Sequence, residues 1–483
     1  MKKTQFRESL LTFGIILCAA VWSASKNISR PLWFDEVITV TGFTLNLDFS
    51  QIYFKYNIPN NHILFTYLLK FFINAWSEFL SVFEWTFRLP SLALSIISLW
   101  TLYRFTRTRA SRETALAASL LFALSMPFAI YSVAIRGYIM SFLFVLLAFI
   151  FCDKALRRKK KTAFILYFIS SLAAVGTIPS NIIPLVLIPF IAARYCKIRE
   201  LLTPGFIAAL LIPLFSILIF YLPIHEKFMA NMNLKEGWSN HSAAISCIYA
   251  AFIVSFLPLI ILAIPAIIKR ETIRIDRLAR LAIFFAPAAV ILISSPAPFP
   301  RVFFPLLALW IPVAAWTASP LIRKLLRKFK DDSRLLIAVA VSALWALSCL
   351  GAKNNLSVWT ARDHGLDDYF SPYYTQKDFQ PFEAGKTIKQ MSEGKSVPVF
   401  VSFDADPYAF GFYWSVLKMP DSLFLFDGPK LKTLSIKRPF SPKTFIVVKD
   451  ENDFKRVLKR FPCKDFRVID AGKYQKIYEV IPE

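Results

Sequence analysis

Long apolar runs follow one another along the first 351 residues of this chain, and they then stop. Apolar stretches of this kind, folded as α-helices, can cross a hydrocarbon core of about 30 Å. The pattern therefore predicts an α-helical polytopic membrane protein with eleven spans, near residues 10–28, 88–104, 113–131, 138–155, 162–178, 180–195, 202–222, 244–268, 281–297, 302–319 and 335–351.

Residues 352–483 carry shorter patterns, which predict a small α/β domain with its own core. Strand composition recurs at 397–403, 423–427, 444–450, 466–472 and 476–481, and helical periodicity lies between the strands at 382–394, 407–419 and 453–461. The acidic stretch "DADPY" (404–408) can be an acidic site at a strand end, but a helix N-cap is the favoured interpretation. We thus expect two domains, at 1–351 and 352–483.

Composition and charge decide the class of protein and its orientation. With 56% hydrophobic and 18% charged residues, the chain is not a soluble protein, and its net charge of +25 does not indicate nucleic-acid binding. The basic residues instead form clusters between pairs of apolar runs, which the positive-inside rule assigns to the cytoplasm. The N-terminus is then cytoplasmic, and residues after about 352 are extracytoplasmic. Cleavage of the first segment as a signal peptide would leave the later topology unchanged.

The first outer loop, 29–87, is too long to be a plain connector. It contains the apolar run 60–80, which Lys70 and Asn74 interrupt. A span here would move the Arg104–Arg112 cluster to the outside, so we expect a helix in the outer membrane interface. The six cysteines have no metal-ligand spacing, and only Cys463 lies in the tail, which excludes a disulfide framework there.

Candidate functional residues gather at the predicted outer face. The stretch "SRPLWFDEVITV" (29–40) places Asp35 and Glu36 directly after the first span. Arg136 and Tyr138 lie in a short turn between two spans, and Arg301 begins another span. Any one of these arginines can simply reach lipid headgroups. Together they form a more specific set, because carboxylates can handle protons or a cation and guanidinium groups recognise phosphate.

Three segments carry a resemblance to a known family. They are "NNHILFTYLLKFF" (60–72), the region from "FRLPS" to "IRGYIMSFLF" (87–144) and "RVFFPLLALWIP" (301–312). With the acidic pair, they resemble membrane glycosyltransferases of the GT-C fold, in the group of protein O-mannosyltransferases, aminoarabinose transferases and lipopolysaccharide-core sugar transferases. The resemblance is clear over about residues 29–150 and 297–312, and the "RLPS" and "IRGY" segments are its most specific parts.

The resemblance implies an inverting transfer of a sugar from a polyprenyl-phosphate donor to an acceptor hydroxyl on the extracytoplasmic side of a bacterial inner membrane. Asp35 matches the general base of the family, and Glu36 is its neighbour; either can also hold a divalent metal, which some relatives use. Arg136, with Tyr138, and Arg301 are candidates for the donor phosphate. His62 matches the histidine of a His-Pro-Pro segment whose prolines are absent here, and Lys55 is a weaker candidate.

Two other functions stay open at this point. A transporter or lipid flippase would place charged residues at mid-membrane, whereas the acids here lie at one membrane face. A family member without catalysis could serve as a binding or assembly subunit. The sugar and the acceptor, which could be a lipid, a glycan or a protein, depend on variable loops and cannot be read from the chain.

Overall fold

The computed structural model describes most of the chain, in segments separated by short gaps and by one longer gap before the C-terminal part. The described residues are 2–25, 27–32, 34–56, 58, 61–76, 84–193, 203–232, 241–268, 275–351, 380–395, 397–402, 405, 407–419, 424–426, 444–449, 451–458, 465–470 and 476–481. The chain divides into two compact units. The helical unit comprises Met1–Ile28, Leu47–Ser77 and Phe87–Phe370, and the α/β unit comprises Ser29–Asn46, Glu78–Thr86 and Ser371–Glu483.

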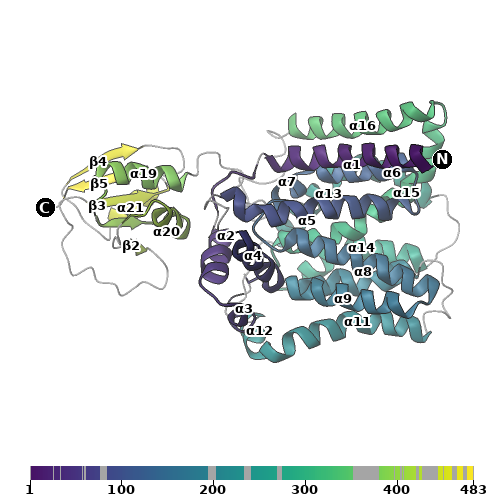
Figure 1. The fold of residues 1–483 in the computed structure, drawn as a ribbon, viewed down its shortest axis with the longest axis horizontal. Helices are drawn as coiled ribbons and strands as arrows, with labels where there is room; N and C mark the ends of the chain where they lie inside the picture. The colour runs from purple at the N-terminus through teal and green to yellow at the C-terminus, as the bar shows by residue number, and fades with distance from the viewer. Residues whose placement is uncertain are drawn as a thin grey trace. The chain divides into compact units, whose positions relative to one another are not determined.

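The helical unit is a bundle of apolar helices (Figure 1). Each of the predicted spans contains an α-helix: α1 (Lys2–Ser25), α5 (Glu84–Arg107, whose first turn belongs to the α/β unit), α6 (Arg112–Ala123), α8 (Tyr138–Arg158), α9 (Lys161–Thr177), α10 (Ile182–Ala192), α11 (Pro204–Tyr221), α13 (His241–Ile268), α14 (Ile275–Ile293), α15 (Leu307–Leu326) and α16 (Asp331–Gly351). Helices α8, α9 and α11 run side by side.

Apolar length identifies the protein as an integral membrane protein, although it does not fix the number of crossings. Within the described residues, four helical stretches are long and apolar enough to span a membrane: Arg7–Ser25, Tyr138–Arg158, Pro204–Met232 and Arg301–Leu326. The other apolar helices are shorter or less apolar over their described residues. The count of eleven spans therefore stays a prediction.

One predicted span is not a continuous helix. The run 113–131 divides into α6 and α7 (Met126–Tyr131) because Pro127 has no N–H to donate to the preceding turn. Ser125 caps the second piece, with its hydroxyl accepting from the Phe128 N–H at 3.3 Å. The residues after α7 stay buried and lead into the turn that holds Arg136.

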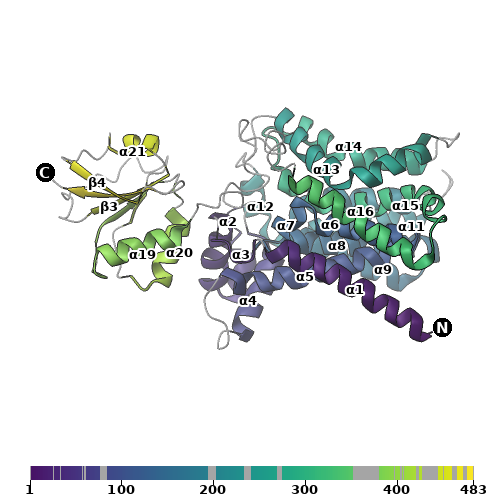
Figure 2. The same ribbon diagram turned by 90° about the horizontal axis from the view of Figure 1, so that it is seen from above.

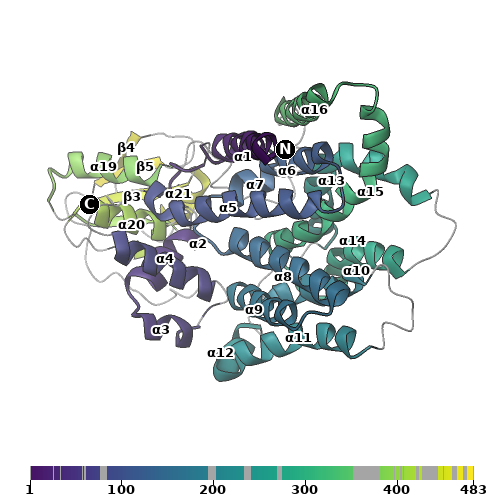
Figure 3. The same cartoon turned by 45° about the vertical axis from the view of Figure 1, so that its right-hand side comes forward.

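Short helices cover the end of the bundle where His62 lies. They are α3 (Phe49–Phe54), α4 (Ile63–Trp76) and α12 (His225–Met232), with α3 and α12 at the same end of the unit (Figure 3). The amide of Asn231 on α12 donates to the Tyr56 carbonyl at 3.0 Å, which fixes the chain after α3. Helix α4 buries Ile63 and Leu69 and exposes Phe71 and Trp76, as expected for a helix at a membrane interface.

The α/β unit has a five-stranded sheet with helices on both faces (Figure 2). The strands are β1 (Val399–Val401), β2 (Phe424–Phe426), β3 (Thr444–Val448), β4 (Asp465–Asp470) and β5 (Lys476–Ile481), in the order β2-β1-β3-β5-β4. The first three strands are parallel, and β5 is antiparallel to β3 and β4. Each strand overlaps a stretch with strand composition in the sequence.

Alternation along the strands divides the core of this unit into two layers. Val399, Val401 and Phe445 pack on the face covered by α19 (Pro381–Met391) and α20 (Pro407–Val416). Phe400 and Ile446 pack on the other face, against α21 (Glu451–Leu458). The unit also contains α2 (Phe34–Val37), which carries the acidic pair and packs against α20.

Candidate functional site

The structure brings two predicted site residues, His62 and Arg136, into contact inside the helical unit. Arg136 lies in the turn before α8 and His62 directly before α4, and their exposed fractions are only 2% and 5%. Nε2 of His62 is 3.2 Å from Nη2 of Arg136. Two of the three segments that carry the family resemblance are thus in contact at one buried place.

The neighbouring Gly137 determines how the imidazole is protonated. Its backbone N–H donates to Nδ1 of His62 at 2.8 Å, so Nδ1 must be unprotonated. In a neutral imidazole the proton then lies on Nε2, which faces the guanidinium. No side chain fits at position 137, because a Cβ there would lie 2.5 Å from Cγ2 of Thr177 and 3.1 Å from Nδ1 of His62.

The His62 imidazole is held neutral by its surroundings. Burial lowers its pKa well below the usual 6.5, and the positive charges of Arg136 and then Arg301 lower it further. A neutral Nε2–H and a guanidinium N–H are both donors, so they cannot bond to each other. They can instead donate to one shared acceptor, and an anionic oxygen satisfies both groups.

Aromatic rings form one wall of this cluster. The ring of Tyr138 meets the His62 ring edge to face at 5.2 Å and lies 4.7 Å from the ring of Tyr131. The guanidinium of Arg136 is 6.0 Å from the Tyr138 ring centroid. Arg301 is the second residue of η5, the 3-10 helix Pro300–Leu306, and its guanidinium is 4.3 Å from the centroid of the Phe299 ring. The wall limits access of water and so strengthens the field of the two arginines.

The remaining candidates of the helical unit have other surroundings. Lys55 is exposed and ends α3, whereas His62 and Arg136 are buried. Arg88 of the "RLPS" segment is fully buried and donates to the carbonyls of Asn27 and Ile28 at 2.9 and 3.0 Å. These carbonyls follow the end of α1, so Arg88 fixes the path of the chain there.

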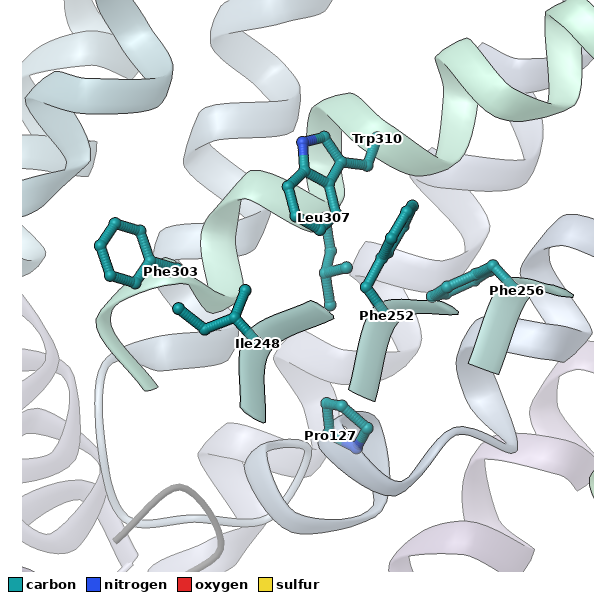
Figure 4. A pocket seen from close by; sticks show the side chains of 7 residues that line it. All are labelled: Pro127, Ile248, Phe252, Phe256, Phe303, Leu307 and Trp310. Atoms are coloured by element: carbon teal, nitrogen blue, oxygen red, sulfur yellow. The ribbon is translucent and has the colours of Figure 1, made fainter. Parts of the chain in front are cut away.

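A small apolar hollow lies elsewhere in the helical unit (Figure 4). Side chains from α7, α13, η5 and α15 line it: Pro127, Ile248, Phe252, Phe256, Phe303, Leu307 and Trp310. The one polar group among these side chains, the Trp310 indole N–H, donates to the Ile283 carbonyl at 3.0 Å. The lining thus suits a hydrocarbon group rather than a polar one.

Asp35 and Glu36 belong to the α/β unit, where both are buried, with exposed fractions of 8% and 0%. They lie on the single turn of α2, and a π-helix (Ile38–Leu45) continues from it. The hydroxyl of Thr39 donates to the Asp35 carbonyl at 2.8 Å and so ties the two helices together. Segments of π-helix occur often at functional sites, and nothing in the periodicity of 38–45 predicted one.

A metal site is not evident at the acidic pair. Consecutive residues of a helix point about 100° apart, so the two carboxylates leave α2 in different directions. Within the described residues, no group of three His, Cys, Asp or Glu side chains comes together. We therefore assign no chemical step to a metal ion.

The sequence analysis missed Gly137 and Asn61. Asn61 donates to the Ile52 carbonyl at 3.1 Å and accepts from the Thr66 hydroxyl at 3.1 Å, which holds the loop that carries His62. Both residues lie within motifs quoted above, Gly137 in "IRGY" and Asn61 in "NNHILFTYLLKFF". A glycine between two candidate functional residues was the available signal for a close backbone approach.

Comparison with known proteins identifies the fold. No known protein-family profile and no curated protein sequence matches the chain. Among solved structures, it is similar to ArnT, an aminoarabinose transferase, from Cupriavidus metallidurans bound to undecaprenyl phosphate, with a TM-score of 0.56, 13% identity and 97% of each chain covered. The chain has the GT-C fold.

This likeness confirms the fold that the sequence motifs predicted. The archaeal oligosaccharyltransferase AglB from Archaeoglobus fulgidus, in complex with an inhibitory peptide and a dolichol-phosphate, is also similar. Its TM-score is 0.48 at 12% identity, with 85% of this chain and 64% of the AglB chain covered. At these identities the similarity concerns the GT-C fold, and the function must be argued from the site.

Proposed function

We propose that this protein is an inverting glycosyltransferase that moves a sugar from a polyprenyl-phosphate donor to an acceptor hydroxyl. The acceptor oxygen forms a bond with the anomeric carbon while the bond from that carbon to the phosphate oxygen breaks. The bonding electron pair leaves with the polyprenyl phosphate, and the acceptor proton goes to a base. The enzyme must therefore remove one proton and stabilise charge on the departing phosphate.

The observation that carries this proposal is the pair of N–H groups on His62 and Arg136. Both are buried donors, and their nitrogens lie 3.2 Å apart. A phosphate oxygen that accepts from both groups gains two contacts, one of them charge-assisted. Because His62 stays neutral, it contributes a directed donor without adding a third positive charge to those of Arg136 and Arg301.

The proposal assigns roles to the other candidates. Asp35 is the general base for the acceptor hydroxyl, and Glu36 supports it. Arg301 provides a second guanidinium for the phosphate, Tyr138 orients His62 and Arg136, and Lys55 assists from the surface. In this arrangement the N-terminus is cytoplasmic, and residues 352–483 are outside the inner membrane.

Comparison of envelope glycolipids tests the reaction. Mass spectrometry of cells with and without this protein should show a sugar-modified lipid, glycan or protein that disappears when the gene is deleted and returns with the wild-type copy. Purified protein in vesicles with an undecaprenyl-phosphate-linked sugar should release undecaprenyl phosphate. If the lipid-linked sugar instead moved across the bilayer without release of undecaprenyl phosphate, the protein would be a transporter and not a glycosyltransferase. No change in any envelope glycoconjugate would favour a non-catalytic subunit.

A further inference from the structure

Tyr413 on α20 makes two hydrogen bonds to parts of the α/β unit that are far away in sequence. Its hydroxyl accepts the backbone N–H of Leu32 at 2.9 Å and donates to Oε1 of Glu84 at 2.7 Å. The Tyr413 side chain is buried, with 3% exposed, and so is Leu32. One hydroxyl thus joins the C-terminal part of the unit to the segments before α2 and at the start of α5.

The position of Tyr413 is itself fixed by the sheet core. On the same helix, Phe410 and Trp414 are buried in the cluster that covers one face of the sheet, with their rings stacked at 5.7 Å. The Tyr413 ring also meets the ring of Phe382 on α19, at 5.9 Å. The hydroxyl is therefore presented from a packed support rather than from a loop.

The segment that Tyr413 holds begins a helical stretch. Helix α2, Phe34–Val37, continues into the π-helix Ile38–Leu45, so Asp35 and Glu36 lie in the first turn, where backbone N–H groups lack intrahelical partners. Leu32 lies three residues before Asp35, so fixing its backbone fixes the start of that turn. Helix α2 also packs directly on α20. The acidic pair therefore depends on α20 both for packing and for a polar contact.

We propose that Tyr413 is a positioning residue, which holds the Leu32–Glu36 segment on α20 so that Asp35 is aligned for its reaction. The C-terminal part of the chain then completes the catalytic machinery rather than serving as a separate binding module. The role given to Asp35 rests on the proposed function, whereas the contact of Tyr413 with Leu32 does not. The two parts can be tested separately.

The contact is tested by hydrogen exchange of the full-length protein in nanodiscs. Tyr413→Phe keeps the ring and removes both hydrogen bonds, so amides of peptides covering residues 29–46 should exchange at least about tenfold faster than in the wild type. Tyr408→Phe removes a hydroxyl from an exposed tyrosine of the same helix and should leave that exchange unchanged. Unchanged exchange in Tyr413→Phe would overturn the proposal.

The positioning role is tested by kinetics with undecaprenyl-phosphate-linked pentoses and hexoses, measured as release of undecaprenyl phosphate. Tyr413→Phe should lower kcat about ten- to a hundredfold, because a small displacement of a catalytic group has this effect, with the KM for the donor within about twofold. Glu84→Gln keeps an acceptor for the Tyr413 hydroxyl and should be intermediate; it also serves if Tyr413→Phe folds poorly.

The outcomes separate the two proposals. Faster exchange at 29–46 with an unchanged kcat would reject positioning by Tyr413 while leaving the glycosyltransferase standing. If Tyr413→Phe raised the KM for the donor, lowered kcat and lowered the thermal unfolding midpoint together, Tyr413 would have a purely structural role. If Asp35→Asn retained full transfer, the proposed role of Asp35 would fail, and so would positioning for it, whatever the exchange result.

Discussion

The buried cluster of His62 and Arg136 and the acidic pair Asp35–Glu36 are held in different ways. In the helical unit, the backbone of Gly137 packs tightly against side chains. Its N–H donates to the His62 imidazole, and a methyl group at position 137 would clash with Thr177. In the α/β unit, the acids lie on α2, the first turn of a longer helical stretch, and the Leu32 N–H just before it donates to Tyr413 from a distant part of the chain. The proposed phosphate contacts are thus preformed by packed helices, whereas the proposed base depends on a long-range contact.

This difference suggests that the two sets of residues contribute to different steps of the proposed reaction. Substitutions around His62 and Arg136 should change mainly how tightly the lipid phosphate binds. Substitutions at the acidic pair should change turnover and leave lipid binding intact. Measuring binding and turnover side by side for matched variants therefore tests whether the comparison is correct.

The largest effect is expected at Asp35. Asp35→Asn keeps the shape of the side chain but cannot take a proton at neutral pH, so transfer should fall by about 10²- to 10⁴-fold if Asp35 is the base. Binding of undecaprenyl phosphate should be unchanged within about twofold, by microscale thermophoresis or an equivalent titration. Asp48→Asn, at the exposed cap of α3, is the matched control and should be fully active.

Glu36 distinguishes the possible meanings of the acidic pair. Glu36→Gln should reduce transfer less than Asp35→Asn. If Glu36→Gln were inactive and Asp35→Asn active, the general base would be Glu36 instead of Asp35. Loss of wild-type activity on adding a chelator, with recovery on adding one divalent cation, would bring a metal into the mechanism. Normal turnover by both single variants and the double variant would remove the acids from the reaction.

A smaller effect is expected at Arg136, on lipid binding rather than on turnover. Arg136→Ala should weaken binding of undecaprenyl phosphate about ten- to a hundredfold, since a charge-assisted contact contributes about 1.5–3 kcal/mol. Arg136→Lys should restore only part, because an ammonium group lacks the planar fork. Arg104→Ala, at an exposed arginine of α5, is the control. Unchanged lipid affinity in a folded Arg136→Ala protein would reject the phosphate role.

The sequence predicted the local features of this protein better than its long-range ones. Apolar runs located the helices, and short motifs selected Asp35, His62 and Arg136 as candidates, because membrane burial and residue chemistry leave local patterns. The contact of His62 with Gly137 joins residues 75 positions apart, and that of Leu32 with Tyr413 joins residues 381 apart. The periodicity of a sequence does not predict contacts between residues so far apart. In the sequence, Tyr413 is only one of several aromatic residues in a predicted helix.

The proline break after α6 marks another limit. The run 113–131 has the hydropathy of a single span, since serine and proline lower the average only slightly. Their effect is on hydrogen bonding: Pro127 removes one donor, and Ser125 replaces the helical partner of Phe128. Whether such a run crosses as one helix depends on geometry that mean hydropathy does not describe.

The smallest effect concerns pH and the neutral state of His62. Above its ordinary pKa of about 6.5, His62 is neutral in both the folded and the unfolded protein and adds no pH dependence. As the pH falls through 6.5, the unfolded chain binds a proton that the folded protein excludes, because burial and the arginines keep the folded pKa well below that value. The free energy of unfolding should therefore fall by about 1 kcal/mol per pH unit in this range.

Thermal unfolding midpoints of the purified protein between pH 7.5 and 5.5 measure this slope. His62→Asn offers an amide oxygen to the Gly137 N–H but does not titrate, so its midpoint should fall less with pH than that of the wild type. His225→Asn, at an exposed histidine of α12, should keep the wild-type slope. If His62→Asn and the wild type had the same slope, the pKa of His62 would be the same in the folded and the unfolded protein, and the folded protein would bind a proton there as readily. The imidazole would then face the phosphate as a cation, and the site would carry three positive charges rather than two.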